Sequence, residues 1–201
     1  MPKPVRARMI EAMEPAGGRV EVIAGPMFAG KTEELLRRVR RALIAGLRVQ
    51  VITHALETRG GADRVASHAG LGHPSKAVPS AAEIAAAVAD DADVVAIDEG
   101  HFFGPDLVPV VADLAAAGAV VVVAGLDVTF GGEPFEPLPS LMALAERVDK
   151  LTAICMVCGA EAIYHARTSP SAASGAQLVP EHVGGAEKYR ALCRRHFAGP
   201  G

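Results

Sequence analysis

The sequence predicts an α/β fold in which a parallel β-sheet is covered by helices on both faces, followed by a smaller C-terminal region. Three observations support this prediction. Short β-branched runs alternate with helical patterns over the first 150 residues, a glycine-rich motif follows the first run, and all three cysteines lie beyond residue 150. Such alternation is typical of consecutive β-α units, which place helices on both faces of a parallel sheet.

Four apolar runs have the length and the β-branched content of buried strands. They read VEVIAG, LRVQVITH, DVVAID and AVVVVAGL, and they predict strands at residues 20–25, 47–54, 93–98 and 119–126. Polar residues, glycines and histidines dominate the segment 57–74, for which we expect a loop.

Three segments show helical patterns. Apolar residues recur at helical spacing from position 32 until a glycine ends the pattern at position 46. Ser80 and Glu83 form a capping-box sequence at the start of an alanine-rich run over residues 80–90. A third helix is expected over residues 105–117.

Composition places the chain among soluble globular proteins. It has 201 residues, of which 50% are hydrophobic and 21% charged, and this fits one substantial domain with a small appendage. A net charge of -3 provides no basic field for nucleic acid, and no apolar run approaches the roughly 20 residues that span a bilayer. An odd number of cysteines disfavours a disulfide framework and fits a reducing cytoplasm.

The pattern of residues divides the chain into three parts. Residues 1–18 carry scattered charges and no apolar core, so we expect a poorly ordered leader rather than a signal peptide. Residues 19–150 carry the alternating α/β pattern. Residues 151–201 contain the cysteines and a loop rich in serine, alanine, glycine and proline, and we expect a separate small domain there.

A phosphate-binding motif joins the first predicted strand to the first predicted helix. It reads GPMFAGKT and matches G-x-x-x-x-G-K-[ST] in the required context. Backbone N–H groups of such a loop cradle phosphates, Lys31 would reach the β- and γ-phosphates, and Thr32 would bind Mg²⁺. The competing interpretation is a glycine-rich turn before a helix. The ATP-binding residues predicted in this loop are Gly25, Pro26, Met27, Phe28, Ala29, Gly30, Lys31 and Thr32.

Two adjacent carboxylates, Asp98 and Glu99, end the third predicted strand. In a phosphate-loop protein, a second strand supplies an acid to the ATP-bound magnesium, and Asp98 has the right place for it. Glu99 could then orient a water, as in an ATPase, or take a proton from a substrate hydroxyl, as in a kinase. The pair alone does not separate the two, and a solvated acid at a strand end is the competing interpretation of Glu99. The following Phe102 and Phe103 are more typical of a core than of a ligand site.

Cys155-x-x-Cys158 and Cys193-x-x-His196 have the spacing of two zinc knuckles. Three thiolates and one imidazole can hold one tetrahedral Zn²⁺, and such a site is structural because protein fills all four positions. Free buried cysteines and a redox C-x-x-C pair are the alternatives.

Together these motifs resemble those of the type II (cytosolic-type) thymidine kinase family. GPMFAGKTEEL resembles its phosphate loop, IDEGHFF its acidic motif, and GLDVTFGGEPF the end of its next strand. LTAICMVCGAEA and VGGAEKYRALCRRHF resemble its two zinc-binding segments. The resemblance covers residues 20–197.

The resemblance implies a RecA-like phosphate-loop core and an enzyme that transfers the γ-phosphate of ATP to the 5′-hydroxyl of thymidine. It implies that Glu99 is the general base, that Asp98 and Thr32 serve Mg²⁺, and that the zinc anchors both ends of a nucleoside-binding lasso loop over residues 162–189. It also implies a cytoplasmic homotetramer that dTTP inhibits, with no membrane or nucleic-acid partner. The substrate-binding positions that it implies are Met27, Phe102, Leu126, His165, Gly184 and Tyr189.

Three residues depart from the family pattern. His101 stands where glutamine is usual, Glu57 where aspartate is usual, and His165 where a threonine beside the thymine 5-methyl group is usual. The acceptor could therefore be thymidine, deoxyuridine or both. The alternative functions are a phosphate-loop ATPase with a zinc-ribbon nucleic-acid-binding module, which the acidic balance disfavours, and a non-catalytic nucleotide-binding relative.

Overall fold

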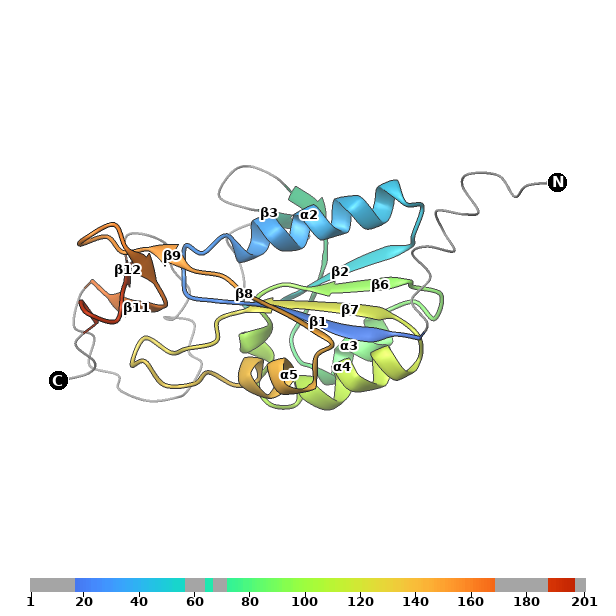
Figure 1. Ribbon diagram of the computed structural model, residues 1–201. Helices are drawn as coiled ribbons and strands as arrows, with labels where there is room; N and C mark the ends of the chain where they lie inside the picture. Colours follow the sequence, from blue (N-terminus) through green and yellow to red (C-terminus); the bar gives the residue numbers. More distant parts are fainter. Residues whose placement is uncertain (1–16, 57–63, 67–71, 169–187, 198–201) are drawn as a thin grey trace.

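A computed structural model describes residues 17–56, 64–66, 72–168 and 188–197 (Figure 1). Residues 1–16 of the predicted leader, residues 169–187 of the predicted lasso loop with Gly184, and Glu57 lie outside these residues. In the described part of the chain, no helix combines the length and the apolar character needed to cross a membrane.

Six strands form one main sheet in the order β5-β2-β6-β7-β1-β8, and every neighbouring pair is parallel. The predicted parallel sheet is therefore confirmed. Since parallel strands carry their carboxyl ends to one edge, the residues that follow β1, β6 and β7 meet at that edge. The strands are β1 (Arg19–Ala24), β2 (Val49–His54), β5 (Lys76–Val78), β6 (Val94–Ile97), β7 (Val120–Gly125) and β8 (Arg147–Lys150).

Helices cover both faces of this sheet, as the sequence predicts (Figure 1). On one face lies α2 (Lys31–Ile44), whose buried stripe includes Leu35 and Val39 and packs against apolar side chains of β1, β6 and β7. On the other face lie α3 (Ala82–Ala87), α4 (Leu107–Ala116) and α5 (Leu138–Leu144). The apolar core thus consists of two layers, one on each side of the sheet.

Several short elements have no counterpart in the sequence-based prediction. The expected loop over residues 57–74 contains β3 (Arg64–Ala66) and β4 (Gly72–Pro74), which pair antiparallel, so the loop prediction is wrong for these residues. A 3₁₀ turn, η1 (Gly100–Phe103), follows β6. These elements are only three or four residues long, too short for a periodic apolar pattern.

The described residues of the C-terminal region form two small antiparallel sheets beside the carboxyl-end edge of the main sheet (Figure 1). One joins β9 (Ala153–Ile154) to β10 (Glu161–Ala162), and the other joins β11 (Tyr164–Arg167) to β12 (Tyr189–Leu192). Phe28 and Ala29 of the phosphate loop pack against the apolar cluster of this region. The C-terminal region and the predicted ATP site are therefore in direct contact.

Candidate active site and metal centre

The phosphate loop leaves β1 at Gly25 and enters α2 at Lys31. Gly25 has a φ of 153°, and a Cβ there would lie 2.6 Å from the carbonyl oxygen of Leu151, so only glycine fits this turn. Phe28 also has a positive φ, 68°, which is unusual for a side chain of its size. The loop is thus bent tightly enough to turn successive N–H groups inward.

Lys31 is buried, and its Nζ donates a hydrogen bond to the carbonyl oxygen of Pro26 at 2.8 Å. This bond closes the loop on itself and holds the ammonium group inside it. A cation in a ring of backbone N–H groups attracts phosphate oxygens, so the geometry fits the predicted ATP-phosphate site.

Asp98 follows β6, and its Oδ2 lies 3.1 Å from the Thr32 hydroxyl, which donates to it. The carboxyl group is buried, and burial raises its pKa to about 7, with the neighbouring Glu99 carboxylate contributing in the same direction. A buried carboxylate beside a hydroxyl offers the hard oxygen ligands that Mg²⁺ prefers. These two residues could therefore hold the metal of Mg-ATP, as the sequence predicts.

The side chain of Glu99, the next residue, has a different neighbour from that of Asp98. Its backbone is left-handed (φ 50°, ψ 42°), and its N–H donates to Oδ1 of Asp98 at 3.0 Å. Glu99 Oε2 lies 3.6 Å from Nδ1 of His101. A non-glycine residue in this conformation is strained, and such strain is typical of functional sites. The turn gives the two adjacent acids separate surroundings, which two separate roles require.

The residues predicted to line the nucleoside pocket come from both the phosphate-loop part and the C-terminal part of the chain. His165 on β11 is 2% exposed, and its ring lies 5.8 Å from that of Tyr189 on β12, edge to face. Burial lowers the pKa of His165 to about 3, with Lys31 and His101 lowering it further and Glu99 opposing them. His165 is therefore buried inside the protein and does not face solvent.

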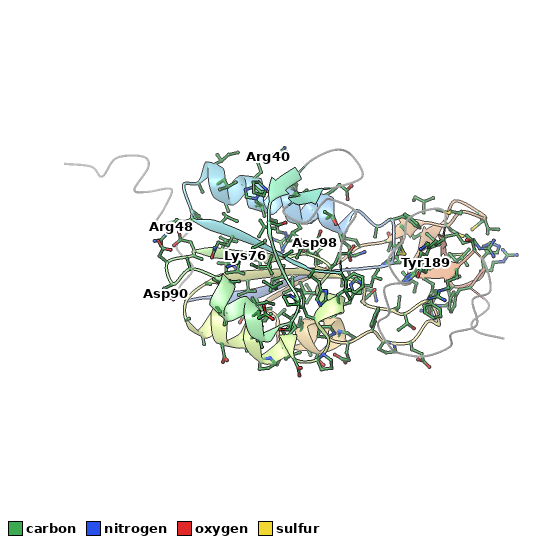
Figure 2. The ribbon with its side chains drawn as sticks, turned by 180° about the vertical axis from the view of Figure 1, so that it is seen from behind. Arg40, Arg48, Lys76, Asp90, Asp98 and Tyr189 are labelled. Atoms are coloured by element: carbon green, nitrogen blue, oxygen red, sulfur yellow. The ribbon has the colours of Figure 1, made fainter. Side chains whose placement is uncertain are left out.

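Three further predicted pocket residues that the structure describes follow strands of the main sheet and lie at its carboxyl-end edge. Phe102 is buried in η1, 4.3 Å from the ring of His101. Met27 in the phosphate loop and Leu126 after β7 are half-buried. Figure 2 shows Asp98 near the end of the main sheet and Tyr189 in the adjoining small sheet.

Two contacts at this edge have no counterpart in the sequence-based prediction. Asp127 is buried after β7, and its Oδ2 lies 2.8 Å from Nζ of Lys150 at the end of β8. The guanidinium group of Arg167 on β11 lies 4.4 Å from the centre of the Phe130 ring. The sequence does contain an indication of Asp127, because this acid directly follows the apolar run of residues 119–126. An acid after an apolar run is also the pattern that identified Asp98.

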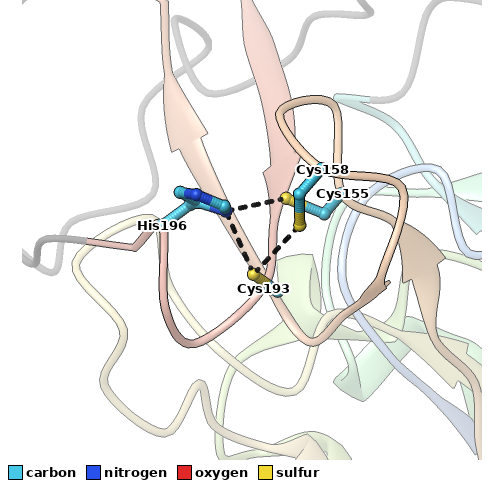
Figure 3. Close-up of side chains that lie close together, drawn as sticks. All are labelled: Cys155, Cys158, Cys193 and His196. Atoms are coloured by element: carbon cyan, nitrogen blue, oxygen red, sulfur yellow. Dashed lines mark hydrogen bonds between the residues drawn. The ribbon is translucent and has the colours of Figure 1, made fainter.

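The four predicted metal ligands converge in the C-terminal region (Figure 3). Their ligand atoms all lie within 4.8 Å of one another; the Sγ atoms of Cys158 and Cys193 are 3.8 Å apart, and His196 Nδ1 is 3.3 Å from Cys193 Sγ and 3.7 Å from Cys155 Sγ. Four Zn–S bonds of about 2.3 Å in tetrahedral geometry place the sulfur atoms about 3.8 Å from one another. The observed distances are therefore close to those of a tetrahedral zinc site. A backbone hydrogen bond from Cys193 lowers the pKa of the Cys155 thiol to about 5, which favours the metal-binding thiolate. The cluster can hold a metal such as zinc.

The fold and the two sites define a phosphate-loop α/β protein with a Cys₃His cluster that can hold a metal. The thymidine kinase family model matches residues 18–197. A thymidine kinase of Deinococcus radiodurans is 48% identical over 189 residues, covering 89% of each chain. This chain belongs to the thymidine kinase family.

Two further relatives agree. A thymidine kinase of Deinococcus deserti is 47% identical over 191 residues, covering 90% of this chain and 95% of that one. A thymidine kinase of Halobacterium salinarum is 48% identical over 180 residues, covering 88% and 92%. Among solved structures, the Thermotoga maritima RuvB Holliday junction branch migration motor aligns with a TM-score of 0.38 and 16% identity over 77% of this chain and 43% of that one, a likeness too weak to support any inference.

Proposed function

We propose that the protein transfers the γ-phosphate of ATP to the 5′-hydroxyl of thymidine, giving dTMP in pyrimidine deoxynucleoside salvage. Deoxyuridine is the second acceptor that we consider. The observation that supports this best is the separation of Asp98 and Glu99, because the Asp98 carboxylate bonds to Thr32 of the phosphate loop and the Glu99 carboxylate lies beside Nδ1 of His101. A kinase needs one acid for the metal and another for the acceptor hydroxyl.

The nucleotide would occupy the loop from Gly25 to Thr32. Lys31 would exchange its bond with the Pro26 carbonyl for the β- and γ-phosphates, which attract an ammonium group more strongly than a neutral oxygen does. Thr32 and Asp98 would hold Mg²⁺. When bound, this ion neutralises charge on the transferred phosphoryl group.

Glu99 would act as the general base. Its side chain is 15% exposed, so it can reach an acceptor from the edge of the sheet while most water is excluded. In this role it takes the 5′-hydroxyl proton as the oxygen attacks phosphorus in line with the leaving ADP.

The nucleoside would lie between the phosphate-loop part and the C-terminal part. We propose residues 19–150 and 151–201 as the two domains, with 1–18 as the leader and the metal as a structural zinc. The zinc would hold β12 beside β9, because Cys193 directly follows β12 and Cys155 directly follows β9. The proposed substrate residues remain Met27, Phe102, Leu126, His165, Gly184 and Tyr189.

We also propose, from family membership, a cytoplasmic homotetramer with feedback inhibition by dTTP. The charge balance that disfavours nucleic-acid binding supports a small-molecule acceptor.

The test is whether ADP release from Mg-ATP depends on thymidine, with dTMP identified as the product. We expect little ADP release without an acceptor and release stoichiometric with dTMP in its presence. ADP release that ignores thymidine and rises with added DNA would instead support the ATPase with a nucleic-acid-binding zinc module. Nucleotide binding without turnover would support the non-catalytic relative.

A further inference from the structure

The imidazole of His101 joins two segments that converge on the proposed catalytic centre. His101 is 3% exposed. Its Nδ1 accepts a hydrogen bond from the backbone N–H of Leu126 at 3.3 Å, and the same atom lies 3.6 Å from Oε2 of Glu99. One ring atom thus contacts the segment after β7 and the carboxylate after β6.

The hydrogen bond from Leu126 fixes the position of the ring proton. An Nδ1 that accepts this bond carries no proton, so a neutral imidazole must carry it on Nε2. The same Nδ1 cannot donate to Glu99, and 3.6 Å is beyond hydrogen-bond length. The Glu99 carboxylate and this ring atom are therefore in packing contact, and the Leu126 hydrogen bond determines which ring atom the carboxylate meets.

Aromatic contacts hold the ring in this orientation. The ring centre of His101 lies 4.3 Å from that of Phe102 and 5.2 Å from that of Phe135. Phe135 lies in the segment after β7. Its N–H donates to the carbonyl oxygen of Asp127 at 3.0 Å, and this bond ties it to the start of that segment. Rotation of His101 away from Leu126 would disrupt these ring contacts.

We infer that His101 is a positioning residue for Glu99, which fixes the proposed general base relative to the Leu126 segment through its Nδ1 acceptor. This inference rests on the proposed function. A general base must lie within about 2.6–3.2 Å of the proton that it takes, and a displacement of about 1 Å can cost about 10²-fold in rate. Loss of the Nδ1–Leu126 bond would let the ring turn within its aromatic contacts and would change the surface against which the Glu99 carboxylate packs.

Two substitutions separate the hydrogen bond from the packing. His101→Asn keeps an acceptor, because its amide oxygen sits as many bonds from the backbone as Nδ1 does, but it loses the ring. His101→Phe keeps the ring between Phe102 and Phe135 but has no acceptor. We expect kcat to fall about 10- to 100-fold in His101→Phe and less than about 5-fold in His101→Asn. The KM for ATP should change less than about 3-fold in both, since the phosphate loop is untouched.

His54 provides a matched control. It is also buried, accepts a backbone N–H from Leu56 at 3.1 Å, and lies 4.8 Å from the ring of Phe103 and 5.9 Å from that of Phe102, but among the described residues it has no hydrogen bond or ion pair with Lys31, Asp98 or Glu99. His54→Phe should leave kcat within about 3-fold of the wild type if position, and not general packing, is what His101 contributes. Thermal unfolding of every variant checks that it is folded, and His101→Leu replaces His101→Phe if the larger ring prevents folding.

The outcomes separate this inference from the proposed function. Wild-type protein without thymidine-dependent dTMP formation would overturn both. With an active wild type, the inference alone fails if His101→Phe keeps its kcat, if His101→Asn loses as much, or if His54→Phe loses as much.

Discussion

The hydroxyl of Thr32 lies 3.1 Å from Asp98 Oδ2, although 66 residues separate them in the chain. They come from the helix after β1 and the end of β6, and β7 lies between these two strands. The sheet order therefore creates the contact, because all three strands carry their carboxyl ends to the same edge. A buried carboxylate at this point is costly unless a cation joins it.

Replacing Asp98 by Asn should therefore lower activity while it raises the stability of the folded protein. The amide keeps the shape and can still accept from Thr32, but it loses the charge that Mg²⁺ needs. We expect kcat to fall by about 10²-fold or more, in the range seen when groups that stabilise transition-state charge are removed. Turnover at saturating and at varied Mg²⁺ measures this, and unchanged magnesium dependence would contradict the assignment.

The same variant should be more stable than the wild type at pH 8 in a magnesium-free buffer with a constant zinc concentration. The folded-state pKa of Asp98 is raised to about 7, so its proton is lost from the folded state only near that pH but from the unfolded state near pH 4. The destabilising effect of Asp98 therefore grows from about pH 4 to about pH 7 and is complete above it. We expect the advantage of Asp98→Asn to be on the order of a few kcal/mol at pH 8 and to vanish near pH 4, as measured by denaturant unfolding.

Changing Glu99 to Gln should remove the general base and leave nucleotide binding intact. The amide is close in size to the carboxylate but cannot accept the hydroxyl proton. Loss of a general base typically costs about 10²–10⁴-fold, and we expect kcat to fall within this range. ATP affinity, measured by calorimetry, should stay near the wild-type value. Near-normal turnover would show that another group takes the proton.

Zinc analysis of the purified protein should find about one zinc per chain, as the single Cys₃His cluster of the described residues implies. Cys193→Ser should weaken thymidine binding more than ATP binding, because Cys193 directly follows β12, where Tyr189 faces His165. Met156→Ser is the control, since Met156 is exposed between Cys155 and Cys158 in the other knuckle of the same cluster and is no ligand. A metal-free protein with full thymidine affinity would refute the structural role.

The sequence predicts the central strands well and the edges of the structure poorly. The strands β1, β2, β6 and β7 each coincide with a β-branched run, because buried parallel strands must be apolar on both faces. By contrast, β8 reads RVDK and is mostly exposed at the edge of the sheet. Its pairing with β1 depends on the folded sheet and leaves no apolar pattern in the sequence.

The candidate site also has parts that the sequence predicts and parts that it does not. The phosphate loop and the zinc ligands are recognisable because each is a short motif with fixed spacing. The contact of His101 with Leu126 joins residues 25 positions apart. It depends on the strand order and on the side-chain geometry after β6, which motif spacing does not encode.

His165 should make the protein less stable in mild acid. Its folded-state pKa is lowered to about 3, whereas an unfolded histidine has a pKa near 6.5. Between these values the unfolded state binds the extra proton, so stability is lost as the pH falls below about 6.5. His165→Phe removes this effect, and the loss of unfolding free energy between pH 7 and pH 5 should shrink by about 2 kcal/mol. Unfolding at a constant zinc concentration measures the difference, and equal losses in both proteins would place His165 in contact with water.

The same imidazole should weaken the preference for thymidine over deoxyuridine. It is buried beside Tyr189, and the charges of Lys31 and Glu99 both affect its pKa, so we expect a nucleoside that presents its 5′-hydroxyl to Glu99 to bring its base near the ring. The ring is larger than the threonine usual at this position, and it would take space that the 5-methyl group needs. Discrimination of one methyl group is worth roughly 1–3 kcal/mol, or about 10–200-fold, and we expect a ratio of kcat/KM values below about 10-fold.

His165→Thr should raise this ratio into the 10–200-fold range. His165→Ala is the matched control, because it also opens space but supplies neither the hydroxyl nor the methyl group of threonine. If steric exclusion alone sets the preference, both variants gain thymidine activity while their activity on deoxyuridine changes little. If contact with the threonine side chain matters as well, only His165→Thr reaches the high ratio. A strong thymidine preference in the wild type that His165→Thr leaves unchanged would mean that the imidazole lies away from the 5-position of the bound base.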